Sequence, residues 1–145
     1  MSDMTWQQAK LLNAYYRKVG LAAVGQGACP HFQLFRAGYD PALEGPENEN
    51  NVPTVADIPM SYSEVPNVFY KGTIDGNFSE DTALCVCEIP KGAVSEPKHF
   101  NVVGIFDQDD ELVAACVTLT DWITPEELDR SYLAVQFPMD LGEGN

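Results

Sequence analysis

The sequence predicts an α+β protein, mainly β, in which an N-terminal helix precedes an antiparallel β-sandwich or barrel-like domain. Apolar residues recur at helical steps near the N-terminus, and β-branched and aromatic runs recur between turn signals from residue 31 onward. Strands and helices do not alternate, which disfavours a doubly wound fold. The 145 residues fit a single domain, with a helical segment over 1–28, a β-rich body over 29–138 and a flexible tail over 139–145.

The helix is expected over residues 5–20. Thr5 and Gln8 have the spacing of a capping box, in which each side chain bonds the other residue's amide. Gly20 is a plausible stop, and residues 21–24 could extend the helix beyond a kink before Gly25 and Gly27 end it. The residues that form its apolar face are Trp6, Ala9, Leu12, Tyr16 and Val19.

Six or seven strands are expected after this helix. Asp75-Gly76 has the composition of a hairpin turn, as does the acidic stretch 107–110. Residues 44–53 are polar and predict an exposed loop, whereas Thr124-Pro125 resembles the start of a short helix. The strand candidates are residues 32–37, 68–74, 82–89, 100–106, 111–119 and 130–137.

The net charge of −14 excludes several function classes. Such an acidic chain repels phosphate backbones and anionic lipid surfaces, so we expect neither nucleic acid nor membrane as a partner. We find no apolar run of membrane-spanning length and no secretory signal, which predicts synthesis in a cytoplasm. The charge is unevenly placed, since residues 1–36 carry +3 and residues 37–145 carry −17. This asymmetry indicates either a partner-facing segment or a chance distribution, and both interpretations stay open.

The four cysteines do not have the spacing of a zinc site. In a cytoplasmic product they are most simply buried small apolar residues, and Cys85 and Cys87 would point to the same face of one strand. The alternative is that one or more form an intermolecular disulfide outside a reducing cell, with Cys29, beside Pro30, the most exposed. The candidates for such a bond are Cys29, Cys85, Cys87 and Cys116.

We identify no catalytic motif, metal-ligand set or cofactor-binding pattern, and therefore expect no enzyme activity and no cofactor. His99 could act as a general base, but a residue at a strand edge is the simpler interpretation. The acidic stretch 107–111 is rich in oxygen ligands, yet it lacks the glycine and ligand spacing of an EF-hand loop, so a solvated turn is expected.

Residues 101–114, NVVGIFDQDDELVA, resemble the hallmark segment of the phage tail-collar fibre family. That segment has the form Glu-hydrophobic-Gly-hydrophobic-Phe-Asp-x-x-Gly-x-Leu-hydrophobic-Ala. The order of the earlier residues, from Leu12-Asn13 through Gly20 to the stretch 32–40, is similar to the family's opening helix and following strand. The chain departs from the pattern where Asn101 or Val102 replaces the acidic residue, and where Asp110 replaces the turn glycine.

The resemblance covers most of the chain and implies a structural virion protein, a short tail-fibre, collar or baseplate attachment module. It implies other tail proteins as partners and an oligomer, commonly a trimer. The basic helix could dock on such a partner or pack on its own body. Aromatic residues are enriched in binding hot spots, which gives the candidate interface residues Trp6, Tyr15, Tyr16, Arg17, Lys18 and Trp122. The alternative is a β-sandwich module that binds a small ligand or carbohydrate.

Overall fold

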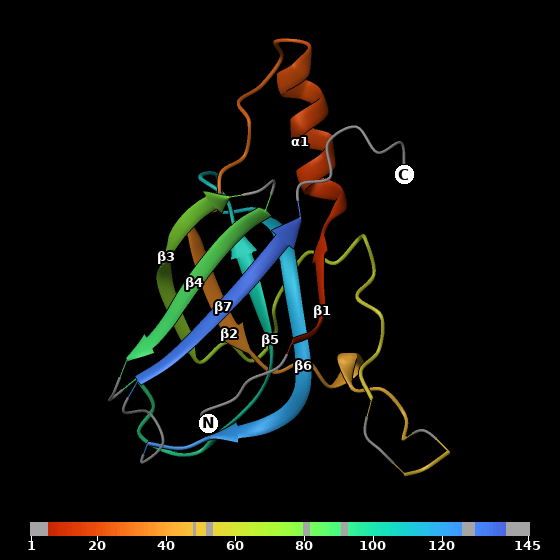
Figure 1. Cartoon of the computed structure of the whole chain (residues 1–145), viewed down its shortest axis with the longest axis vertical. Coiled ribbons are helices and arrows are strands. Elements are labelled where there is room, and N and C mark those ends of the chain that lie inside the picture. The colour runs from red at the N-terminus through yellow and green to blue at the C-terminus, as the bar shows by residue number, and fades with distance from the viewer. Residues whose placement is uncertain are drawn as a thin grey trace.

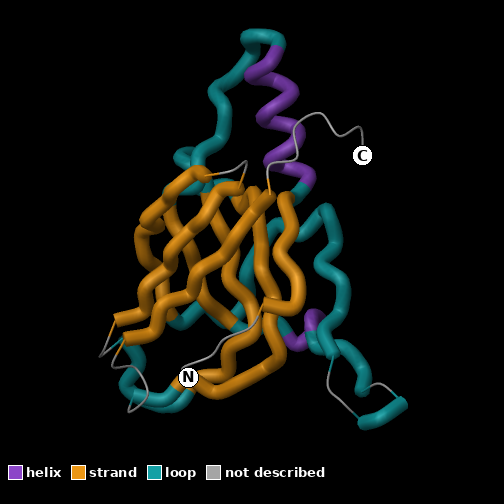
Figure 2. The backbone as a smooth tube through the Cα atoms, viewed as in Figure 1, coloured by secondary structure: helices purple, strands orange, loops and turns teal. Residues whose placement is uncertain are grey.

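The computed structural model describes residues 6–47, 49–51, 54–79, 82–90, 93–125 and 130–138. It is mainly antiparallel β with one N-terminal α helix, which confirms the predicted fold class (Figures 1 and 2). The strands form one sheet in the order β1-β6-β5-β2-β3-β4-β7. The sheet curls until its edge strands β1 and β7 contact each other, giving a barrel-like body. Its elements are β1 (Trp6–Leu11), α1 (Asn13–Ala23), β2 (Leu34–Gly38), the 3-10 helix η1 (Pro41–Leu43), β3 (Tyr70–Ser79), β4 (Thr82–Pro90), β5 (Lys98–Phe106), β6 (Leu112–Ile123) and β7 (Arg130–Pro138).

The first part of the predicted helix is wrong, because residues 6–11 form β1 and the helix begins at Asn13. β1 pairs with β6, with Leu11 opposite Ala114, so tertiary pairing overrides the local helical pattern. Leu12 separates the two elements: its side chain is buried and its amide donates to the carbonyl of Val113 at 2.9 Å. Gly20 lies inside α1, and the helix ends at Ala23, before the positive φ of Gly25.

A second correction concerns the expected turn at Asp75-Gly76. Both residues lie inside β3, and they pair with Val86 and Cys85 of β4. β3 instead continues to Ser79, which pairs with Thr82 of β4, so the strand predicted over 68–74 starts later and ends later than expected. Residues 126–127 of the expected helix start at 124–127 and the whole tail at 139–145 lie outside the described residues.

The β5–β6 hairpin is buried on both faces. Val103 and Ile105 point into the barrel, where they pack with Phe35 of β2. Val102 and Phe106 point outward and are covered by the segment between β2 and β3, which contributes Ile58 and Val65 among others. This burial on both faces explains the near-continuous apolar composition of β5 and β6. If one face of each strand were exposed to water, polar and apolar residues would alternate along it.

Candidate functional site

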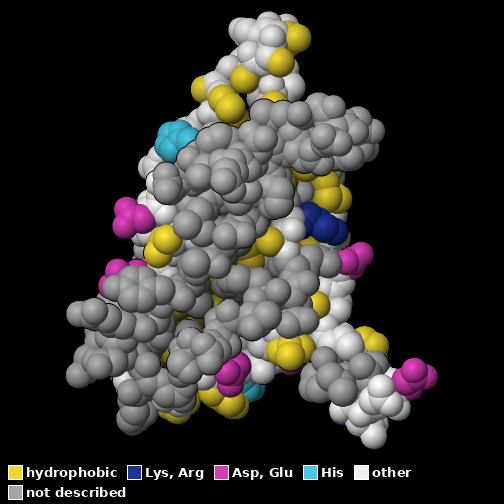
Figure 3. All heavy atoms as spheres, viewed as in Figure 1, with side chains coloured by type: hydrophobic (Ala, Val, Ile, Leu, Met, Phe, Trp, Pro, Cys, Tyr) yellow, Lys and Arg dark blue, Asp and Glu magenta, His cyan; other side chains and the backbone are white. Residues whose placement is uncertain are grey.

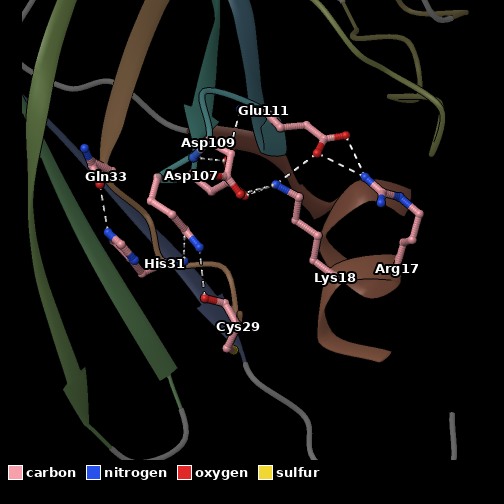
Figure 4. A network of polar contacts seen from close by, with 9 residues as sticks. Arg17, Lys18, Cys29, His31, Gln33, Asp107, Asp109 and Glu111 are labelled. Atoms are coloured by element: carbon pink, nitrogen blue, oxygen red, sulfur yellow. Dashed lines mark hydrogen bonds and ion pairs between the residues drawn. The ribbon is translucent and has the colours of Figure 1, made fainter. Parts of the chain in front are cut away.

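The helix α1 stands above the end of the barrel, and the chain returns beside it over residues 24–33 (Figure 1). We call residues 13–33, α1 together with this return segment, the spur. Tyr15 is the buried residue of α1, so the helix contributes little to the barrel core. The base of the spur instead contacts the acidic turn between β5 and β6 through polar groups, as Figure 4 shows.

Lys18 is the centre of this contact. Its Nζ atom lies 2.5 Å from Asp107 Oδ2, 3.0 Å from Glu111 Oε1 and 3.2 Å from Asp109 Oδ2 (Figure 4). Burial alone would lower the pKa of the ammonium group, but its hydrogen bonds to the three carboxylates outweigh burial and raise the pKa. The lysine is therefore held fully charged among three acids.

Asp107, whose carboxylate binds this ammonium group, has a fully buried side chain. Its other oxygen, Oδ1, accepts hydrogen bonds from the amides of Asp109 and Glu111, each at 3.0 Å. Burial favours the neutral acid, yet the bond from Lys18 and the two amide bonds more than offset it and lower the pKa of the carboxyl. Asp107 therefore shapes the turn and anchors the helix at once.

Two further contacts fix the spur. Arg17 Nη2 donates to both carboxylate oxygens of Glu111, at 2.9 and 3.0 Å, in an exposed pair. On the other side, Gln108 accepts from the amide of His31 at 3.0 Å and donates to the carbonyl of Cys29 at 3.3 Å (Figure 4). The same turn thus holds both the helix and the return segment, so the spur has a defined direction relative to the barrel.

The uneven charge of the sequence is largely explained by these contacts. Lys10 donates to the carbonyl of Ile58 at 2.7 Å, and Arg36 pairs with Asp110 at 2.7 Å. With Arg17 and Lys18, three of the four bases of residues 1–36 therefore pair with acids of their own chain, while Lys10 binds a backbone carbonyl. Among the described residues of the face drawn in Figure 3, acidic side chains appear at several separate points and basic ones are sparse.

The predicted interface residues separate in the structure. Tyr16 is exposed on α1, whereas Tyr15 is buried and its ring lies 6.0 Å from that of Phe32, so Tyr15 packs within the protein. Arg17 and Lys18 bind the turn of their own chain. Trp122 is exposed near the far end of β6, away from the spur. Trp6 contributes its backbone to β1, and its side chain lies outside the described part.

Trp122 belongs to a separate aromatic cluster. The ring of His99 lies between those of Trp122 and Tyr39, with centroids 3.6 and 4.9 Å away. Beside it, Thr120 donates its hydroxyl to Glu44 at 2.7 Å. His99 is thus held by ring contacts, and its neighbour in the stack, Trp122, has 49% of its surface exposed.

The cysteines divide into one exposed thiol, Cys29, and three buried ones, all of them free. Cys85 and Cys87 face the barrel interior together, as their spacing predicts, and Cys116 joins the same apolar cluster. Burial raises the pKa of Cys85 to about 11 and raises the pKa of Cys116 as well. A folded neighbour cannot reach Cys85, Cys87 or Cys116, which leaves Cys29 as the thiol that an intermolecular disulfide could use.

One buried network has no counterpart in the sequence-based predictions. Asn101, fully buried, accepts from the amide of Asp40 at 2.8 Å and donates to the carbonyl of the same residue at 2.9 Å. Asp40 in turn accepts from the hydroxyl of Tyr62 at 2.7 Å. Burial and this bond raise the pKa of Tyr62. An amide suits this position because it both donates and accepts, which a carboxylate cannot do, and no pattern in the sequence indicates that Asn101 and Asp40 meet.

Within the described residues, no group of His, Cys, Asp and Glu side chains has the arrangement of a metal site. In that same part of the chain, no helix has the length and apolar character needed to cross a membrane. In comparisons with known proteins, no family model, no curated protein and no solved structure matches the chain.

Proposed function

We propose that this chain is a structural virion protein of a tailed bacteriophage, a short tail-fibre, collar or baseplate attachment module. The observation that carries the proposal is the fixed spur. An 11-residue helix that buries only Tyr15 in its own protein, and is held in one direction by Lys18 and Asp107, suits insertion into a neighbour. Exposed Tyr16 and Val24 give it an apolar contact surface.

Two details of the β5–β6 hairpin agree with the family pattern. Gly104 stands at the first glycine of the pattern, and a Cβ atom there would clash with Val65 and lie 2.7 Å from Leu112 Cδ1. Asp110 stands at the second glycine, and its φ of 60° lies in the left-handed region that glycine favours. Both positions therefore have the backbone requirement that the pattern implies, which supports the resemblance.

In this role the partners are other tail, collar or baseplate proteins, the chain forms an oligomer for which a trimer is favoured, and it resides in the virion after synthesis in the host cytoplasm. No enzyme activity is needed. The test is incorporation: particles of the encoding phage are purified and probed with antibody by electron microscopy. We expect label at one tail position, and a Tyr16→Asp, Val24→Asp variant that folds normally should be lost from particles. Unlabelled particles, or full incorporation of the variant, would refute the proposal.

The aromatic cluster supports a second candidate, a module that binds carbohydrate. Sugar rings stack on exposed aromatic faces, and Trp122, His99 and Tyr39 form a short aromatic surface with Glu44 nearby. A glycan array with the intact chain tests this candidate. Binding that Trp122→Ala abolishes, while Tyr16→Ala leaves it unchanged, would favour it over the attachment role.

A further inference from the structure

An open groove of about 460 Å³ lies on the outer face of the barrel, between β2, β3 and the segment that covers β5. Its apolar lining comes from Val65, Val68 and Phe106, and its polar groups come from Ser63 and four charged residues. The size is within the range of about 300–1,000 Å³ typical of small-ligand sites. The charged residues are Arg36, Glu64, Lys71 and Asp110.

The two cations of this groove are directly opposite each other. Arg36 of β2 pairs in register with Lys71 of β3, so both side chains project from the same face of the sheet. Like charges at such a position repel and destabilise the strand pair. Only 8 residues of the chain are basic against 22 acidic ones, yet two of the basic residues face each other here. Asp110, which pairs with Arg36 at 2.7 Å, and Glu64 balance their charge within the groove, so an incoming anion must replace Asp110 to bind between the two cations.

The hydrogen bonding of the two cations is incomplete. Arg36 donates from Nη2 to Asp110 at 2.7 Å and lies over the ring of Phe106, while its Nε atom is buried without an acceptor. The side chain of Lys71 is exposed, and no ion pair or hydrogen bond joins its ammonium group to another of the described residues. A guanidinium group binds a carboxylate best through two parallel N–H bonds, and Asp110 uses one.

We propose that the groove binds a ligand in which a carboxylate is attached next to an apolar group. In the empty groove, the carboxylate of Asp110 occupies the position on Arg36 that the ligand would take. The incoming carboxylate would lie between Arg36 and Lys71, displace Asp110 from Nη2 and accept from Nε as well. Its apolar neighbour would contact Val65 and Val68. This inference is independent of the proposed virion role.

The source of the carboxylate is either a small organic acid or an acidic peptide segment. Ser63 also lines an adjoining groove of about 340 Å³ beside α1, which would accommodate the continuation of a peptide. Three probes distinguish the sources: butyrate, acetyl-Leu-Glu-Leu-amide and its neutral analogue acetyl-Leu-Gln-Leu-amide. Each is titrated into the intact ¹⁵N-labelled chain, and chemical shifts are followed at residues 63–71 and 110.

We expect saturable shifts with the glutamate peptide and at least about tenfold weaker binding of the glutamine peptide, because charge-assisted bonds are the stronger ones. Butyrate binding as tightly as the peptide identifies a small acid as the source, and weaker binding identifies a peptide. If neither acid binds, or if the glutamine peptide binds as well as the glutamate peptide, the proposal is wrong.

Variants assign the binding to these side chains. Arg36→Gln and the exposed Lys71→Gln should each weaken binding, by about tenfold for the arginine. Lys98→Gln removes the same charge from a pair with Glu96 outside the groove and should change affinity less than twofold. Asp110→Gly removes the competing carboxylate and should tighten binding severalfold. Equal losses in Lys71→Gln and Lys98→Gln, or no gain in Asp110→Gly, would overturn the assignment.

Discussion

The ammonium group of Lys18 lies 2.5 Å from the fully buried carboxylate of Asp107, which joins α1 to the turn between β5 and β6, 89 positions further along the chain. Because the side chain of Asp107 is fully buried, water cannot replace the bond from Lys18 if that lysine is removed. The two residues therefore behave as a unit, in which each charge depends on the other.

Lys18→Met should be strongly destabilising, by about 3 kcal/mol, because it leaves a buried carboxylate without its cation. Urea unfolding followed by circular dichroism measures the change. Arg17→Met is the matched control on the same helix; since its pair with Glu111 is exposed, the loss should stay below about 1 kcal/mol. Similar losses in both variants would contradict the role that we assign to burial.

The stability of the chain should fall in acid through the same contact. Bonds from Lys18 lower the pKa of Glu111, and those from Lys18 and two amides lower the pKa of Asp107 against the effect of burial. Because both pKa values are lower in the folded state, their contribution is complete above the unfolded values near 4 and is lost as pH falls through the folded ones. Unfolding free energies measured between pH 7 and pH 2 should show a smaller slope in Lys18→Met than in the parent chain.

At the turn position where the family pattern has glycine, Asp110→Gly and Asp110→Ala should differ in stability. Both remove the partly exposed pair with Arg36, but only alanine must keep a Cβ atom at a φ of 60°. We expect the alanine variant to be less stable than the glycine variant by about 1 kcal/mol. Thermal and urea unfolding of the two proteins give the comparison, and equal stabilities would mean that the turn changes its conformation.

The thiols should react in two classes. In the native chain a thiol reagent should modify Cys29 at once, whereas Cys85, Cys87 and Cys116 should react only on unfolding, since burial excludes the reagent and raises their pKa values. Any covalent dimer formed in air should disappear in Cys29→Ser. Rapid modification of a second thiol in the folded protein would show that the barrel opens.

Asn101→Asp tests the buried amide. The substitution removes the donor to the carbonyl of Asp40 and adds a second carboxyl group beside that residue. A loss of about 2–3 kcal/mol is expected at neutral pH, partly recovered in mild acid when the new group is protonated. Val102→Ala, which leaves a cavity at the adjacent buried residue, is the control, and its stability should not recover in mild acid.

Local patterns predicted strands where the composition was distinctive, as in β4 and β5. They misplaced the helix because residues 6–11 have a helical pattern and a β partner in β6 that only the folded chain provides. The local sequence predicts a turn at Asp75-Gly76, because nothing local indicates that β3 continues to Ser79.

Part of the site follows from the sequence. The charge count distinguishes a +3 segment from a −17 segment, and the structure shows how they meet at Lys18 and the acidic turn. The opposition of Arg36 and Lys71 was not predictable, because register between distant strands sets which side chains face each other.

The pairing of β1 with β6 also has a kinetic consequence. Trp6 lies opposite Thr118, so the first strand of the described chain has no hydrogen-bonding neighbour until β6 has been synthesised. Closing so long a loop is entropically costly, and folds dominated by such distant pairs form slowly. The barrel should therefore close late, after the β5–β6 hairpin has formed, and nascent chains should expose the apolar faces of β5 and β6 to chaperones in the meantime.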